Sequence, residues 1–345
     1  MNVLRRSFVV AGALLGLAAS SGCGEVVYGV ELGGRRVPVI DMHLHPGEWQ
    51  GVPSATAAFL AGRFPFPFNT DPETLANGIL SAEGIAEQLD DGGISRGLLY
   101  AVYAPRTVGV APNSLVIDYL EEMPDRFYGL ASLRVDNWRE DRDSELSALE
   151  TALQTPGMVG VKLAHAHMHF RMDDPDYFGI YEVAGRLQKP VYLHTGTSPF
   201  PGTSRDAAYT DPAYLEDAIA AYPDTTFILG HLGFDFIERK HSGLDTCIDL
   251  AQRYPNVYLE PSALGSKGSD PEGNKLTEAM RKMRDGGVVD RIIYGSDGPQ
   301  SPGFLDDYLG RTVDAMKRSD YTVEEMEQVL AGNFARVFGV EVPQL

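Results

Sequence analysis

Short apolar runs alternate along the chain with stretches in which apolar residues recur every three or four positions. Eight runs have the character of buried strands, at residues 37–45, 95–103, 127–135, 158–165, 190–196, 225–232, 256–262 and 290–297. Eight stretches have helical spacing, at residues 82–91, 113–122, 144–154, 177–188, 213–222, 244–254, 276–284 and 304–318. Strands that alternate with such helices indicate βαβ units and a parallel sheet. Eight units predict an α/β fold of the closed (β/α)8 type, a TIM barrel; an open doubly wound sheet is the alternative.

Two segments exceed this alternation. Residues 47–81 form a long connection after the first run, and it holds the aromatic residues Trp49, Phe59, Phe64, Phe66 and Phe68. Long connections at the carboxyl ends of barrel strands commonly carry function, so we expect a lid or one wall of a pocket here, with a surface excursion as the alternative. Residues 322–340 have the pattern of a final amphipathic helix, which we expect to pack on the barrel.

Composition narrows the range of functions. The 345 residues are 43% hydrophobic, which suits a large core, and the length fits a barrel of roughly 250 residues with insertions. The net charge of −19 argues against nucleic-acid binding, which needs a basic surface, and against attraction to anionic lipid. No Gly-x-Gly-x-x-Gly or Walker-type loop follows an early strand, so nucleotide-phosphate binding has no support.

The first 22 residues have the pattern of an export signal. Arg5 and Arg6 precede an apolar run at residues 8–19, which is too short to span a bilayer, and small residues follow it. The arginine pair resembles a twin-arginine signal, although Leu4 stands where that signal has Ser or Thr. We therefore expect three parts: a signal peptide at 1–22, a linker or short hairpin at 23–36, and the barrel at 37–345.

The sequence Ser20-Ser21-Gly22-Cys23 resembles a bacterial lipobox, in which the cysteine is lipidated. We expect an exported protein of the bacterial envelope or periplasm that meets the membrane only through a lipid on Cys23; cleavage without lipidation is the alternative. Cys247 then has no partner for a disulfide, and we expect it to be a small buried apolar residue.

The motif His43-Leu44-His45 ends the first apolar run. Side chains two apart share one face of a strand, so Asp41, His43 and His45 project together, and two imidazoles lie side by side where the strand ends. Imidazole is the commonest protein ligand of transition metals. Taken alone, the pattern is explained equally well by two polar residues at the end of a strand as by two metal ligands.

Polar residues also end four other runs: Lys162, His194, His231 and Asp297. In a barrel, the carboxyl ends of all strands meet at one mouth. Core packing does not explain these residues, because an unpaired buried charge is costly. One divalent ion could instead be surrounded, with a position left open for water, by His43, His45, His194 and Asp297.

Several motifs together are similar to those of the amidohydrolase-related proteins, in the branch called amidohydrolase 2. They are His-Leu-His at 43–45, Gly-Val-Lys at 160–162, Leu-His-Thr-Gly at 193–196, Gly-His-Leu-Gly at 230–233, Asn-Val-Tyr-Leu-Glu at 256–260, Tyr-Gly-Ser-Asp-Gly-Pro at 294–299 and Leu-Ala-Gly-Asn-Phe-Ala-Arg-Val-Phe-Gly at 330–339. The resemblance implies a metal-dependent TIM barrel with the same four ligands. We expect one divalent ion, Zn²⁺ before manganese or iron, with His231 beside it to polarise or protonate the substrate.

The resemblance leaves the role of Lys162 open. In binuclear members of the superfamily, a lysine on the fourth strand is carbamylated and bridges two ions, whereas in the mononuclear branch it can face the substrate as a cation. A lysine at a strand end can also extend its amine to solvent. We expect a catalytic role for Lys162 beside a single ion.

The expected reaction is hydrolysis of an amide, lactone or ester of a small organic substrate by metal-activated water. Asp297 would take the proton of the water and pass it to the leaving group, and His231 would stabilise negative charge on the carbonyl oxygen. Two alternatives stay open: a non-oxidative decarboxylase of an aromatic or unsaturated acid, and an envelope lipoprotein that binds without catalysis. A homo-oligomer is compatible with each.

Further candidates flank these residues. Arg134, Arg106, Tyr103 and Glu260 are candidates for substrate binding, because an arginine can hold a carboxylate through two hydrogen bonds and Glu260 ends the seventh run. Glu260 could instead orient a metal ligand. The alternating histidines 165, 167 and 169 are out of phase with the inward face that carries Lys162, so we expect them in a polar loop. His241 lies among polar and charged residues and is expected to be exposed.

Overall fold

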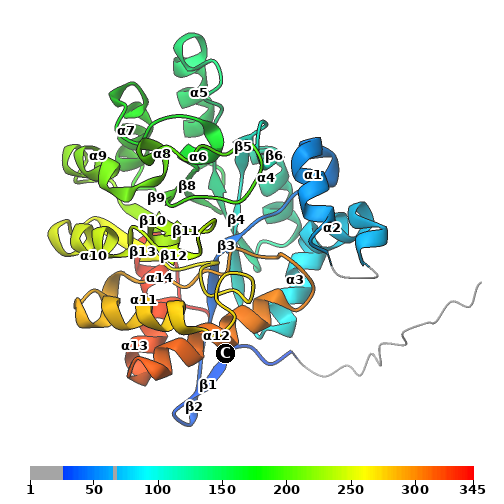
Figure 1. Cartoon of the computed structure of the whole chain (residues 1–345), viewed down its shortest axis with the longest axis vertical. Helices are drawn as coiled ribbons and strands as arrows, with labels where there is room; N and C mark the ends of the chain where they lie inside the picture. Colours follow the sequence, from blue (N-terminus) through cyan, green and yellow to red (C-terminus); the bar gives the residue numbers. More distant parts are fainter. Residues whose placement is uncertain (1–25, 65–67) are drawn as a thin grey trace, which may run out of the picture.

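Seven parallel strands form one curled sheet in the computed structural model, which describes residues 26–64 and 68–345. The strand order is β13-β10-β9-β8-β7-β4-β3. The strands coincide with the first seven predicted runs: β3 (Ile40–Leu44), β4 (Arg96–Tyr100), β7 (Phe127–Ala131), β8 (Met158–Leu163), β9 (Val191–His194), β10 (Phe227–Gly230) and β13 (Val257–Glu260). Figure 1 shows these strands at the centre of the molecule, with helices around them.

The eighth predicted strand, at 290–297, closes the ring without becoming a regular strand. The amide of Met42 donates to the carbonyl of Tyr294 at 3.1 Å, and the amide of Ile293 donates to that of Leu259 at 2.9 Å. The amide of Asp297 also donates to the carbonyl of His43 at 3.1 Å, and isolated bridges join Ile292 to Leu259 and Gly298 to Leu44. The prediction of a full strand was therefore wrong, although barrel closure was correct. The backbone of Asp297 is left-handed, with φ of 67°, and the amide of His45 donates to the carbonyl of Gly298 beyond it at 2.8 Å.

The surrounding helices follow the predicted spacing. Three have the predicted bounds: α3 (Ala82–Asp91), α4 (Asn113–Glu122) and α12 (Phe304–Arg318). The Ser81 hydroxyl caps α3 by accepting from the amide of Gly84. Five others differ at their ends: α5 (Trp138–Leu153), α7 (Gly179–Arg186) after the turn η3 (Pro175–Tyr177), α9 (Glu216–Ala221) after η4 (Pro212–Leu215), α10 (Leu244–Arg253) and α11 (Asn274–Asp285).

The carboxyl-terminal segment closes the amino-terminal end of the barrel. It is helical throughout, as predicted, and consists of α13 (Val323–Glu327), a π-helical turn η7 (Gln328–Gly332) and α14 (Asn333–Phe338), with helical backbone angles at both joins. Phe334 and Phe338 join the apolar cluster inside the barrel, which includes Ile40, Met42, Leu98, Leu130, Tyr192, Ile228 and Ile293. This end is filled with apolar side chains, which leaves the polar strand ends at the opposite, carboxyl end.

Short elements crowd the carboxyl end of the barrel. They are η1 (Trp49–Gly51), α1 (Ser54–Ala61), η2 (Phe68–Thr70), α2 (Pro72–Leu80), β5 (Val102–Ala104), β6 (Gly109–Ala111), α6 (His165–Met168), α8 (Ala207–Thr210), η5 (His231–Gly233), β11 (Phe234–Asp235) and β12 (Lys240–His241), whereas η6 (Val289–Arg291) lies at the amino-terminal end. The long connection 47–81 therefore carries two α-helices. Phe59 on α1 lies with its ring centroid 5.4 Å from that of Phe200, after β9, so this connection forms a wall over the barrel mouth.

The remaining sequence predictions have mixed outcomes. Part of the expected linker is a hairpin of β1 (Val30–Leu32) and β2 (Arg35–Val37), and Cys247 is buried as predicted. The signal peptide, Cys23 and Phe66 lie outside the described residues. Within 26–64 and 68–345, none of the helices combines the length and the apolar character that crossing a bilayer requires.

Candidate active site

The side chains of His43, His45 and Asp297 meet at the carboxyl end of β3. Asp297 Oδ1 lies 3.1 Å from His43 Nε2 and 3.0 Å from His45 Nε2, and the two Nε2 atoms are 3.1 Å apart. We call these three residues the donor triangle. Ligands held about 2.1 Å from an ion stand about 3.0 Å apart at neighbouring octahedral corners, so the triangle has the dimensions of one face of a metal site. The His43 side chain is fully buried, whereas those of His45 and Asp297 are 37% and 23% exposed, which opens the triangle to solvent.

Asp297 carries the negative charge of the triangle. Burial by itself would raise its pKa, but the hydrogen bond with His45 and the positive charges of His231, His45 and Lys162 hold the pKa below its usual range. Its carboxylate is therefore ionised at neutral pH and able to hold a cation.

His194 ends β9 on the neighbouring side of the mouth. Its Nε2 is buried and has no hydrogen-bond partner among the described residues, and its ring centroid lies 4.4 Å from that of His231. Burial lowers the pKa of His194 well below the usual value, which keeps the ring neutral. The ring nitrogens of His194 lie outside the set of donor atoms from His43, His45 and Asp297, which all lie within 4.8 Å of one another. A neutral imidazole with an unused buried nitrogen nevertheless suits a metal ligand.

The second ring nitrogen of His43 belongs to a buried hydrogen-bond network. Nδ1 lies 3.2 Å from Glu260 Oε1, 3.0 Å from Ser262 Oγ and 3.1 Å from the Tyr192 hydroxyl. His43, His231 and Glu260 also place donor atoms within 4.8 Å of one another. There, however, the hydroxyls of Tyr192 and Ser262 already donate to Glu260, at 3.1 and 2.8 Å. This inner set is therefore a hydrogen-bond network that orients Nε2 of His43 toward the triangle.

Glu260 lies beneath His43, with its side chain fully buried. Burial raises its pKa to about 8, while the Ser262 hydrogen bond lowers it. This placement fits the role of orienting a metal ligand and keeps the carboxyl away from a substrate in the mouth.

His231 is buried at the end of β10. Its Nδ1 donates to the Ser262 carbonyl at 3.2 Å, and its Nε2 lies 3.4 Å from the Tyr192 hydroxyl. Burial lowers the pKa of His231 to about 4, against the opposing charge of Asp297. His231 and Leu232 both have positive φ, 61° and 53°, a strained conformation that is typical of functional sites.

Lys162 ends β8 as a buried cation. Its Nζ lies 4.0 Å from the centre of the Tyr192 ring and 4.7 Å from that of Tyr100. Burial lowers the pKa of Lys162 to about 7, while the charges of Asp297 and Glu260 raise it. The amine therefore titrates near neutral pH. The neighbouring aromatic rings favour its charged form.

Asp41 shares the strand face of His43 but points into the barrel wall. Its Oδ1 accepts from the amide of His43 at 3.0 Å and from that of Ser296 at 2.9 Å. Burial raises its pKa to about 6. Asp41 thus ties β3 to the segment that carries Asp297, a role that the alternation of the strand did not predict.

Three predicted substrate-binding residues lie apart from the donor triangle. Arg134 is exposed, and the side chain of Arg106 is 67% exposed and 3.8 Å from Asp136. The hydroxyl of Tyr103 accepts from the amide of Asn113 at 3.1 Å. In the part of the chain that the structure describes, none of the three contacts the triangle through a hydrogen bond or ion pair.

The expectation of a polar loop at 165–169 was wrong. His165 and His167 are buried on α6, and the His167 ring centroid lies 4.9 Å from that of His194. Alternation from Lys162 no longer applies, because the chain turns from strand to helix after Leu163. Burial lowers the pKa of His167 to about 3, and Lys162, His231 and His45 lower it further. His241 is likewise not exposed as predicted, with 13% of its side chain accessible.

His165 makes the protein sensitive to acid. Burial lowers its pKa to about 3, against 6.5 in an unfolded chain, so the unfolded state binds the proton more readily. The stability that neutral His165 contributes is complete above pH 6.5 and is lost as the pH falls toward 3. Between pH 7 and pH 4, proton binding by this residue in the unfolded chain lowers the free energy of unfolding by about 3 kcal/mol. We expect His165→Phe to reduce the fall in unfolding free energy over this range by that amount, measured by urea denaturation; an unchanged fall would contradict the assignment.

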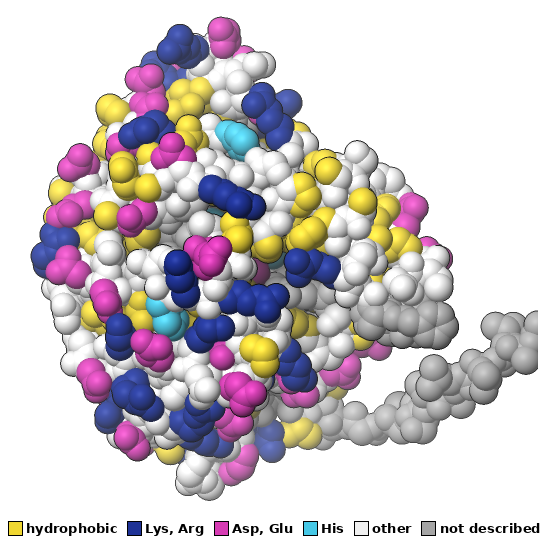
Figure 2. Space-filling view, in the orientation of Figure 1, with side chains coloured by type: hydrophobic (Ala, Val, Ile, Leu, Met, Phe, Trp, Pro, Cys, Tyr) yellow, Lys and Arg dark blue, Asp and Glu magenta, His cyan; other side chains and the backbone are white. Residues whose placement is uncertain are grey.

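The surface around the mouth carries charges of both signs. Figure 2 shows Lys and Arg side chains beside Asp and Glu side chains near the centre of the face that Figure 1 presents. The segments after the strands carry exposed cations at Arg106, Arg134, Arg205, Arg239 and Lys240, and exposed carboxylates at Glu48, Asp206 and Glu238.

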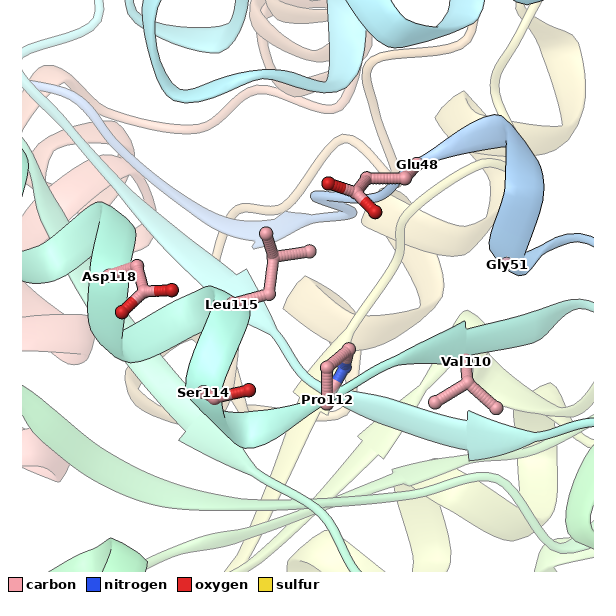
Figure 3. Close-up of a pocket in the computed structure, with 7 residues that line it drawn as sticks. All are labelled: Glu48, Gly51, Val110, Pro112, Ser114, Leu115 and Asp118. Carbon is pink, nitrogen blue, oxygen red and sulfur yellow. The ribbon is translucent and has the colours of Figure 1, made fainter.

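A separate surface cleft of about 240 Å³ lies beside the site. Figure 3 shows it between the start of α4 and the segment after β3, with Glu48 and Asp118 on its two sides. Gly51, Val110, Pro112, Ser114 and Leu115 complete its lining. No residue of the donor triangle lines this cleft, so it is distinct from the candidate active site.

The barrel gathers two histidines and an aspartate at its carboxyl end, a donor set that suits a divalent metal. The family model described as Amidohydrolase (Amidohydro_2) matches residues 40–340, so the chain belongs to this family. It is also 28% identical over 152 residues to the protein fluG of Emericella nidulans; the match spans 41% of this chain and 16% of that protein.

Solved structures share the fold at low sequence identity. An uncharacterized TIM-barrel protein from Bordetella bronchiseptica has a TM-score of 0.67 and 20% identity, covering 88% of this chain and 99% of that one. A probable 2-pyrone-4,6-dicarboxylic acid hydrolase from Acinetobacter baumannii, with citric acid bound, has a TM-score of 0.58 and 20% identity over 87% and 99%. A 5-carboxyvanillate decarboxylase from Novosphingobium aromaticivorans, complexed with manganese and a nitrobenzoic acid, has a TM-score of 0.62 and 17% identity over 91% and 99%.

Proposed function

We propose that this protein is a metal-dependent hydrolase of an amide, lactone or ester bond in a small organic substrate. The observation that carries the proposal is the donor triangle, in which three ligand atoms lie 3.0–3.1 Å apart at the open end of the barrel. The unused Nε2 of His194 supports a fourth ligand. His43, His45, His194 and Asp297 would hold one divalent ion, and these mixed donors suit zinc or manganese.

The side chains around the triangle have the properties that hydrolysis needs. A divalent ion supplies Lewis-acid activation of water and of a carbonyl oxygen. Asp297, ionised and partly exposed, would take the proton of the attacking water and return it to the leaving group. Lys162 would stabilise negative charge on the carbonyl oxygen when protonated. His231 would assist only as an imidazolium, because its neutral ring already donates its N–H to the Ser262 carbonyl. Glu260 and Tyr192 would hold His43 in one orientation.

Decarboxylation of a carboxylated ring is the second candidate. The manganese-bound 5-carboxyvanillate decarboxylase shares the fold, and the buried cation Lys162 near the donor triangle could hold a carboxylate. Carbon dioxide release from aromatic acids, compared with acid release from lactones, separates the two reactions.

Export and lipidation of Cys23 are further proposals, tested by mass spectrometry of the mature amino terminus.

Metal removal tests both reactions. We expect a chelator to abolish turnover and readdition of Zn²⁺ or Mn²⁺ to restore it, because the proposed reaction needs the ion as a Lewis acid. Metal analysis of the purified protein should find about one divalent ion per chain. Full activity in metal-free protein would contradict the proposal, and metal binding without any turnover would favour the binding lipoprotein.

A further inference from the structure

Both ends of the described chain lie together on the barrel. Leu345 packs so closely on Gly29 that a Cβ atom at Gly29 would lie 2.7 Å from Leu345 Cδ1. Figure 1 accordingly marks the carboxyl terminus close to the hairpin of β1 and β2. Val340, just before the terminus, packs against the apolar cluster that closes the amino-terminal end of the barrel. The two ends therefore meet at the end of the barrel opposite to the donor triangle.

Specific contacts fix the first described residues at this end. The Tyr28 hydroxyl donates to Asp90 Oδ1 at 2.9 Å, and the amide of Gly29 donates to the carbonyl of Gly93 at 2.7 Å. Arg126 pairs with Asp90 at 2.8 Å, and its guanidinium lies 5.4 Å from the centre of the Tyr28 ring. Gly93 and Arg126 directly precede the amino-terminal ends of β4 and β7. The chain is therefore attached to this end of the barrel from residue 28 onward.

Exposed apolar side chains gather where the two ends meet. Five large hydrophobic residues are exposed in the described chain, and four of them belong to its ends: Val26, Val27, Val342 and Leu345. We call these four residues the terminal patch. Val27 and Leu345 are the most exposed, at 60% and 54%. Single exposed apolar residues need no explanation, whereas several gathered at one place indicate a contact surface.

The chain before residue 26 indicates which partner the terminal patch meets. Cys23, the predicted lipidation site, precedes Val26 by three residues. Three residues span at most about 11 Å, whereas a domain of this size is about 50 Å across. A lipid on Cys23 would therefore hold the terminal patch at the bilayer surface and leave the donor triangle at the far end of the barrel.

We propose that the terminal patch rests on the bilayer that anchors the lipid of Cys23, so that the mouth of the barrel faces the aqueous phase. The four apolar side chains enter the boundary between headgroups and acyl chains. The active site then receives a water-soluble substrate and not one dissolved in the bilayer. The inference rests on the proposed lipidation of Cys23 and is independent of the reaction at the donor triangle.

The charges beside the terminal patch have both signs. Arg36 donates to the carbonyl of Gly29 at 3.1 Å and faces Glu31 across the hairpin. Glu341 is exposed next to Val342, and the terminal carboxylate adds a further negative charge. Attraction to anionic lipid needs an excess of positive charge, so the contact depends on the apolar side chains.

Fluorescence quenching on the lipidated protein tests the orientation. An added cysteine is the only reactive thiol, because Cys247 is buried and the lipid blocks Cys23. A fluorophore is attached at Gln344→Cys beside the terminal patch or at Ala213→Cys at the mouth end, both exposed positions. On phosphatidylcholine vesicles with nitroxide-labelled lipid, we expect quenching at 344 to exceed that at 213 by about threefold or more, because interfacial contact is shallow. Addition of phosphatidylglycerol should not increase this ratio.

Substitutions in the terminal patch test its contribution apart from the anchor. Val342→Ser combined with Leu345→Ser removes half of the patch far along the chain from Cys23, and we expect it to lower quenching at 344 by about half. Tyr214→Ser is the matched control: Tyr214 is the fifth exposed residue and lies on η4, between β9 and α9 at the mouth end. It should change quenching at neither position. Thermal melts show that each variant is folded.

Each other outcome overturns a defined statement. Equal quenching at the two positions, or stronger quenching at 213, overturns the orientation. Quenching at 344 that the double substitution leaves unchanged, or that requires phosphatidylglycerol, overturns the terminal patch as the contact. A dimer in detergent that the double substitution dissociates assigns the patch to a second copy of the chain. A mature protein without lipid overturns the lipidation and this inference with it, whereas turnover of the same sample tests the proposed function separately.

Discussion

Asp297→Asn is expected to lower turnover by about 10³-fold while the protein stays folded. The carboxylate has two functions in the proposed reaction: it balances the charge of the ion beside His43 and His45, and it carries the proton of the attacking water. An amide of the same shape can do neither, since it has no charge and binds no proton near neutral pH. Steady-state turnover, metal content and circular dichroism on the same preparation measure the effect.

Gln300 provides the matched control for Asp297. Its side-chain amide donates to the backbone carbonyl of Asp297 at 3.0 Å and contacts Oδ2 at 3.4 Å, yet it is exposed and touches neither histidine of the donor triangle. Gln300→Ala should change turnover by no more than a few-fold. A fully active Asp297→Asn protein would show that the carboxylate takes no part in the mechanism, whatever the turnover of Gln300→Ala.

His43→Asn is expected to abolish metal retention and also to destabilise the metal-free protein by about 3 kcal/mol. Both ring nitrogens of His43 are in use, Nε2 in the donor triangle and Nδ1 in the network with Glu260, Tyr192 and Ser262. Removal of the ring takes the His43 partner out of this buried network, although Tyr192 and Ser262 still donate to Glu260. The loss of buried hydrogen bonds of this kind costs about 1–3 kcal/mol.

His45→Asn separates the two effects. The His45 side chain is 37% exposed and contributes its Nε2 to the triangle. We expect it to lose metal as His43→Asn does, with less than about 1 kcal/mol of lost stability. Metal analysis and urea denaturation of chelator-treated proteins give the two quantities. Equal stability losses would show that the inner network does not depend on His43, and retained metal in either variant would exclude that histidine as a ligand.

The sequence by itself determined the barrel and most of its mouth. Alternation of apolar runs and helical spacing gave seven strands and eight helices, because burial inside a parallel barrel demands continuous apolar strands. His43, His45 and Asp297 were predictable from the same pattern, since every strand of such a barrel ends at one rim. The prediction needed only the fold and the position of each residue at a strand end.

Only the tertiary structure decided what lies beneath and beside that rim. Asp41 ties two segments together, Tyr192 and Glu260 orient His43, and His167 enters the mouth from a helix, while Arg106 and Arg134 stay at the surface. Strand alternation cannot predict these contacts, because they depend on where the chain leaves the strand and on which loops pack together. The period of a strand fixes the direction of a side chain only as long as the strand continues.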